Sequence, residues 1–260
     1  MTNIKSHLFN KEIFLKNCLK SHQITEGVRN RMCDWLIEIQ HTFKISDETY
    51  FKAIQVMDNY LKNKNIMMSN EDIHLLGSCS IFIASKFCDI ESLRTEQIHE
   101  DITQGKFTID NILEKERDIF QLIGSNLVTP TILEFIDYYI ANCIKFCENC
   151  SDFLIDYIIL IRENSIFYAK LTLSESTSIY EFDMKTFAQA LIYGSILKLS
   201  RDSSNKIDGI LNWVKGIVSS PLEIDLIEKC QKKINSSFAK ISKNLGSFDK
   251  LLLFEAQRQI

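Results

Sequence analysis

Apolar side chains recur at steps of three and four residues along almost the whole chain, the spacing of one face of an α-helix. The first clear stripe is formed by Val28, Met32, Trp35, Ile39 and Phe43, and it predicts a helix between its first and last members. No stretch alternates convincingly with the period of two that is typical of a half-buried strand. The pattern therefore predicts an all-α protein.

Small polar residues mark the starts of further helices. Ser46, Ser69 and Thr108 each precede a helical pattern and belong to a residue type that caps helix N-termini. Gly124 is expected to end the helix that Thr108 begins, because glycine is common directly after a helix. A shorter helix is expected over about 94–103.

One helix has no polar face. Residues 75–85 are apolar or small on every side, which predicts a helix buried among others. Gly77, Ser80 and Ala84 lack bulk, so neighbouring helices can approach them closely. We expect this helix to lie at the centre of a bundle.

Pro130 is the strongest candidate for a domain boundary, because proline stops one helix and restarts the next. A second set of helical patterns follows, and its segment 183–199 again has small residues on more than one side. The prediction is two tandem five-helix domains, each with a buried central helix. The second set is expected over about 131–147, 151–173, 183–199, 205–217 and 222–243. The predicted divisions of the chain are an N-terminal helical extension 1–26, a first domain 27–129, a diverged second domain 130–246 and a tail 247–260.

Charge and hydropathy narrow the function. Lys and Arg number 30 and Asp and Glu 34, so the net charge is −4 and argues against nucleic acid as a partner. No apolar run approaches the roughly 18–20 residues of a membrane span, so no membrane partner is expected. The N-terminal residues also lack the apolar stretch of a secretion signal. We expect an intracellular protein, cytoplasmic, nuclear or both.

The eight cysteines are interpreted as reduced, mostly buried thiols. Cys143, Cys147 and Cys150 have the spacing closest to a metal site, but they provide three ligands where structural zinc takes four. On a helix they would form one apolar stripe, so we expect core packing and no metal. The familiar catalytic and phosphate-binding motifs are also absent, and the five histidines are scattered. The chain is therefore predicted to use no cofactor and not to be an enzyme.

Three stretches carry a family resemblance. Residues 28–39 (VRNRMCDWLIEI), 57–61 (MDNYL) and 82–87 (FIASKF) resemble the cyclin box, most closely that of the A- and B-type mitotic cyclins. The box is marked by an Arg, an Asp, a Leu, a Lys and a Glu at separated positions. These correspond here to Arg29, Asp58, Leu75, Lys86 and Glu116. The second half resembles the C-terminal cyclin box more weakly.

The resemblance implies roles for particular residues. Arg29 and Asp58 would form an ion pair that fixes the first helix against the second. Lys86 and Glu116 would bind the backbone of a cyclin-dependent protein kinase, with Ile83 and Phe87 as apolar neighbours. The family's substrate-docking patch corresponds to Val28, Arg31, Met32, Trp35, Glu38 and His74. Arg31 replaces an aliphatic residue there, so docking of substrates or inhibitors through Arg-x-Leu motifs is left open.

The expected function is that of a cyclin, a regulatory subunit that binds and activates a cyclin-dependent Ser/Thr kinase in cell-cycle control. One alternative is a cyclin-fold scaffold in a larger assembly that does not activate a kinase. A second is a general transcription factor of the same fold, which would need a basic DNA-binding face that the net charge of −4 disfavours.

Overall fold

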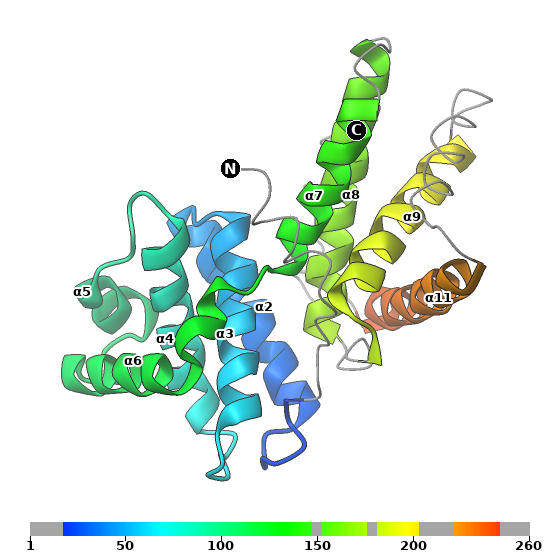
Figure 1. The fold of residues 1–260 in the computed structure, drawn as a ribbon. Coiled ribbons are helices and arrows are strands. Elements are labelled where there is room, and N and C mark those ends of the chain that lie inside the picture. The colour runs from blue at the N-terminus through cyan, green and yellow to red at the C-terminus, as the bar shows by residue number, and fades with distance from the viewer. Residues whose placement is uncertain (1–17, 147–151, 176–180, 203–220, 245–260) are drawn as a thin grey trace. The chain divides into compact units, whose positions relative to one another are not determined.

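The computed structural model describes residues 18–146, 152–175, 181–202 and 221–244. These ranges are built from helices joined by turns and contain no β-strand, so the all-α prediction is confirmed. The chain divides into two compact units, Lys16–Thr131 and the part from Ile132 onward (Figure 1).

The first unit is a helical bundle. Its elements are α2 (Glu26–Phe43), α3 (Asp47–Asn63), α4 (Asp72–Cys88), α5 (Thr95–Gln97), the π-helical turn η1 (Ile98–Ile102), α6 (Ile109–Ile123) and the 3-10 helix η2 (Gly124–Val128). The short helix expected near 94–103 is thus one α-helical turn followed by a π-helical turn.

Side-chain caps explain where α3 and α6 begin, whereas Ser69 does not cap α4, whose N-cap is Glu71 and makes no side-chain cap bond. The Ser46 hydroxyl accepts a hydrogen bond from the Thr49 amide at 3.2 Å, and Thr108 does the same for Asn111 at 3.2 Å. Each bond satisfies one of the amides that the first turn of a helix leaves unpaired. Gly124 follows α6 with a φ of 42°, a conformation that glycine adopts without steric cost.

Helix α4 is the buried centre of this unit, as its composition predicts. It contacts α2, α3 and α6, and Leu76, Cys79, Ser80 and Ala84 are fully buried. The Ser80 hydroxyl donates back to the Leu76 carbonyl at 2.7 Å, so its polar group is satisfied inside the helix.

The second unit has a similar plan. Its described helices are α7 (Ile132–Phe146), α8 (Asp152–Glu175), α9 (Met184–Asp202) and α11 (Pro221–Asn244). Helix α9 contacts the other three, and its Ser195 hydroxyl lies 3.1 Å from that of Ser165 in the buried interface with α8. The helix expected over 205–217, the N-terminal extension as far as residue 17 and the tail 247–260 lie outside the described residues.

Candidate functional site

Lys86 and Glu116 meet on the surface of the first unit. The Lys86 ammonium in the last turn of α4 lies 2.8 Å from Oε1 of Glu116 in the middle of α6. The same ammonium lies 3.7 Å from the centroid of the Phe82 ring, which limits where the Lys86 side chain can point. The side chain of Lys86 is 40% exposed and that of Glu116 is 13% exposed, so the pair remains accessible to a partner.

Helix α6 presents an apolar stripe beside this pair. Ile109, Leu113 and Phe120 are exposed, and with Glu116 they follow one another at steps of four, three and four residues. That spacing places all four on one side of the helix. Glu116 is therefore an acidic position within an otherwise apolar, exposed stripe.

The end of α4 adds two more apolar side chains. Phe87 is 53% exposed and Ile90, just beyond the helix, is fully exposed. We call Lys86, Phe87, Ile90, Ile109, Leu113, Glu116 and Phe120 the α4–α6 face; all are exposed except Glu116, which is half-buried. Ile83 does not belong to it, because its side chain is only 1% exposed and packs in the core. The prediction that Ile83 contacts a partner is therefore corrected: α4 turns that residue inward, among the helices that surround it.

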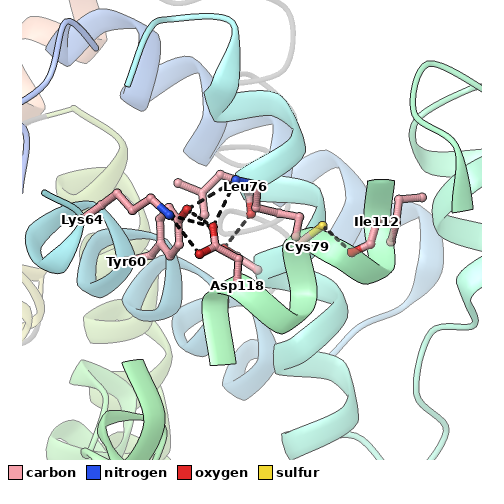
Figure 2. A network of polar contacts seen from close by, with 8 residues as sticks. Tyr60, Lys64, Leu76, Cys79, Ile112 and Asp118 are labelled. Atoms are coloured by element: carbon pink, nitrogen blue, oxygen red, sulfur yellow. Dashed lines mark hydrogen bonds and ion pairs between the residues drawn. The ribbon is translucent and has the colours of Figure 1, made fainter. Parts of the chain in front are cut away.

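A polar network anchors α6 to α3 two residues from Glu116. Figure 2 shows the Asp118 carboxylate in contact with both Tyr60 and Lys64. The Tyr60 hydroxyl donates a hydrogen bond to the Asp118 carboxylate, and the Lys64 ammonium lies 2.9 Å from each carboxylate oxygen. Partial burial alone would raise the pKa of Asp118, but these hydrogen bonds and the nearby lysine charges lower it. The ionised carboxylate therefore holds α6 in place beneath the α4–α6 face.

Arg29 and Asp58 join α2 to α3 inside the unit. Two hydrogen bonds link them, from Nε to Oδ1 at 2.9 Å and from Nη2 to Oδ2 at 2.7 Å. Arg29 is fully buried, and the Cys18 thiol lies 3.4 Å from Oδ1 of Asp58. This bidentate geometry sets the register of the two helices.

The residues of the predicted docking patch are only partly at the surface. Arg31 and Glu38 are exposed, Val28, Trp35 and His74 are half-buried, and Met32 is buried. The rings of Trp35 and His74 meet edge to face at 4.9 Å, and His74 also contacts Phe107 at 5.4 Å. The Lys106 ammonium lies 3.0 Å from Nδ1 of His74, which must accept because lysine only donates. Met32 thus supports the patch from below and contributes little of its surface.

Comparison with known proteins identifies the family. Residues 3–128 match the model of the cyclin N-terminal domain. These residues, just under half of the chain, belong to the cyclin N-terminal domain family. The chain is 30% identical over 125 residues to the G2/mitotic-specific cyclin-B3 of Drosophila melanogaster, an alignment that covers 47% of this chain and 20% of that protein. It is 28% identical over 167 residues to the S-phase entry cyclin-6 of Saccharomyces cerevisiae, covering 60% of this chain and 43% of that one.

The fold agrees with that membership. The structure of a viral cyclin from herpesvirus saimiri superposes with a TM-score of 0.65 at 14% identity, covering 90% of this chain and 96% of the other. The chain spans less than half the length of these two curated relatives. The similarity to mitotic cyclins predicted from the sequence is confirmed.

Among the described residues, no group of three His, Cys, Asp or Glu side chains is arranged to hold a metal ion. Cys143 is buried in α7, whereas Cys147 and Cys150 lie outside the described ranges. Within those ranges no single helix has the length and apolar character to cross a membrane; only Ile109–Ile123 taken together with Asn126–Lys145 passes that test of composition.

Sequence reasoning missed the exposed members of α6. The chain pattern of this helix contains two apolar stripes, one through Ile112, Ile119 and Ile123, which are buried, and one through Ile109, Leu113 and Phe120. The two stripes lie next to each other, so the apolar arc of this helix is wider than the part that its own unit buries. That second stripe was the available signal.

Proposed function

We propose that this chain is a cyclin that acts as a non-enzymatic regulatory subunit, binding and activating a cyclin-dependent Ser/Thr kinase in cell-cycle control. The observation that carries the proposal is the Lys86–Glu116 pair, surrounded by the exposed apolar side chains of the α4–α6 face. Family membership and the match of the five box positions support the same function.

The chemistry of the face suits a partner's helix end. The ends of a helix leave backbone carbonyl and amide groups without partners inside that helix. A lysine ammonium can donate to such carbonyls and a carboxylate can accept from such amides, as charge-assisted hydrogen bonds. Lys86 and Glu116 supply one group of each kind, and the apolar side chains around them supply buried area.

Activation then requires preference for one kinase conformation. An active kinase has its C-helix Glu paired with the lysine of strand β3. A partner shifts this equilibrium only through its higher affinity for the active form, and a change from 1:99 to 99:1 requires about 5.5 kcal/mol. An interface of about 2,000 Å² in total, with a well-packed apolar centre, can supply that difference.

The test compares three purified chains with a panel of cyclin-dependent kinase catalytic subunits, and measures both binding and phosphorylation of a peptide substrate. The first is wild type and the second carries Lys86→Ala and Glu116→Ala. The third is a matched control carrying Lys185→Ala and Glu223→Ala, which removes a half-exposed ion pair of 3.2 Å from the second unit. We expect wild type and control to activate one kinase, and the Lys86/Glu116 variant to lose at least tenfold in affinity.

Two results would contradict the proposal. If wild type binds no kinase of the panel, or binds one without raising its activity, the scaffold function becomes the better account. If the Lys86/Glu116 variant binds and activates as well as the control does, the α4–α6 face is not the site of activation.

A further inference from the structure

Lys52 of α3 is a buried lysine in the first unit. Its side chain is only 3% exposed, a rare position for a lysine unless its charge is paired or hydrogen-bonded. An ammonium has three donors. Three acceptors lie within hydrogen-bonding distance of Nζ: Oε1 of Gln55 at 3.0 Å, the Leu127 carbonyl at 3.0 Å and the Thr129 carbonyl at 2.9 Å.

Two of these acceptors belong to the backbone just after α6. Leu127 lies in η2, and Thr129 follows that helix directly. Gln55, which accepts from Lys52, also donates through Nε2 to the carbonyl of Pro130 at 3.0 Å. Lys52 and Gln55 together therefore donate hydrogen bonds to three carbonyls of the segment 127–130. Carbonyls at the end of a helix have no partner within the helix, so they need such donors.

The same ammonium lies beneath the α4–α6 face. Its nitrogen is 5.5 Å from the centroid of the Phe87 ring, which is half exposed. It also contacts the carbonyls of the residues on either side of Val128, whose own side chain is 64% exposed. The Phe87 ring and the carbonyls on both sides of Val128 all lie close to the Lys52 nitrogen. Phe87 and Val128 are therefore near each other at the surface.

We propose that Lys52 is a positioning residue that fixes Phe87 and the backbone on both sides of Val128, so that Val128 extends the α4–α6 face as a kinase-binding surface. The inference rests on the proposed function for the identity of the partner, the kinase catalytic subunit. Val128 is assigned to this surface because it lies near Phe87, which directly follows Lys86 and already belongs to the α4–α6 face. The buried ammonium holds the backbone of this segment directly, through the carbonyls of Leu127 and Thr129.

The first test measures order in the chain without any partner. The Thr129 amide donates to the Asn126 carbonyl at 3.2 Å, so its hydrogen exchange reports on the end of η2. Lys52→Met keeps an unbranched side chain as far as Cε but removes the ammonium with its three donors, and we expect exchange at Thr129 to accelerate at least fivefold. Lys62→Met is the matched control, since Lys62 is an exposed lysine of the same helix. It should leave exchange at Thr129 unchanged.

The second test measures affinity for the kinase that wild type binds. Lys52→Met and Phe87→Ala are compared singly and together, because residues that act through one another give non-additive effects. We expect about a tenfold loss for each single variant and little further loss for the double variant. Val128→Ser, at a position whose side chain is 64% exposed, should weaken binding about threefold or more.

The outcomes separate this inference from the proposed function. Unchanged exchange at Thr129 in Lys52→Met, or fully additive losses of affinity with Phe87→Ala, would overturn the positioning role. Full affinity of Val128→Ser would overturn the extension of the face. If wild type binds no kinase, the proposed function and the extended kinase-binding surface both fail, while exchange at Thr129 still decides whether Lys52 orders this segment.

Discussion

Arg29 and Asp58 form a bidentate ion pair between α2 and α3, with both hydrogen bonds at or below 2.9 Å and the arginine fully buried. The two residues are 29 positions apart in the chain. Both ions have left water, so their mutual contacts offset the cost of burying them. The pair therefore sets geometry more than it adds net stability.

Removing one member should be costly. Arg29→Met leaves the Asp58 carboxylate buried without its cation, and we expect a loss of about 3–5 kcal/mol in the free energy of unfolding. The double variant Arg29→Met/Asp58→Leu removes both charges and should recover a large part of that loss. Urea denaturation of wild type, Arg29→Met, Asp58→Leu and the double variant measures the coupling. Additive losses would show that the pair is not the source of the effect.

Gly77 of α4 allows a close approach to Met32 of α2. A Cβ atom added at Gly77 would lie 2.7 Å from both Sδ and Cε of Met32. Gly77→Ala should therefore force the end of the Met32 side chain to move and lose most of the roughly 1 kcal/mol that alanine ordinarily gains over glycine within a helix, and Met32→Ala in the same chain should restore part of that gain. Gly27→Ala is the control, because its added Cβ would meet Arg31 at an ordinary 3.9 Å. Thermal and urea unfolding of each variant test this; an equal effect of the two alanines would contradict the packing argument.

His74 should make stability depend on pH. Burial, with a further contribution from the charge of Lys106, lowers the pKa of His74. An unfolded histidine titrates near pH 6.5, so the unfolded chain binds this proton more readily than the folded one. The free energy of unfolding therefore keeps its full value above about pH 6.5. It decreases as the pH falls below that value, until His74 is protonated in the folded state too.

Comparison with His74→Gln isolates this effect. Glutamine retains an acceptor for Lys106 but does not titrate, and the other histidines are common to both chains. We expect the urea midpoint of wild type to fall relative to that of His74→Gln between pH 7.5 and pH 5.0. Parallel pH profiles of the two chains would contradict the prediction.

The buried thiols should be unreactive in the folded chain. Burial raises the pKa of Cys33, Cys79 and Cys230 to about 12, so almost no thiolate forms at neutral pH. Cys88, at the end of α4, is only half-buried. Site-resolved mass spectrometry after brief alkylation should find Cys88 modified and those three protected, with all four modified in denaturant. Rapid native labelling of Cys79 would contradict the burial of α4.

Much of the fold followed from local pattern. The stripe that ends at Phe43, the caps at Ser46 and Thr108 and the end at Gly124 all lie where periodicity and capping chemistry place them. These features depend on residues within a few positions of one another, so they can be recognised without a tertiary structure. The spacing of the five cyclin-box positions was recognisable for the same reason.

Exposure was harder to predict, because it depends on which helix covers which side. Ile83 and Phe87 are four residues apart on α4, yet one is buried and the other half exposed. The exposed stripe of α6 was missed for this reason. Lys52 was missed as well, because a lysine in an amphipathic helix is ordinarily a solvent-facing residue.

Local periodicity and residue spacing were enough to predict an all-helical protein, its central buried helix and its resemblance to cyclins. Each of these features depends on residues that are close together in the sequence. The tertiary structure alone brought Lys86 to Glu116 across 30 residues and the Lys52 ammonium to carbonyls 75 and 77 residues away. Contacts over such separations arise only when whole helices pack, and packing also determines which charges are buried and which apolar side chains remain for a partner.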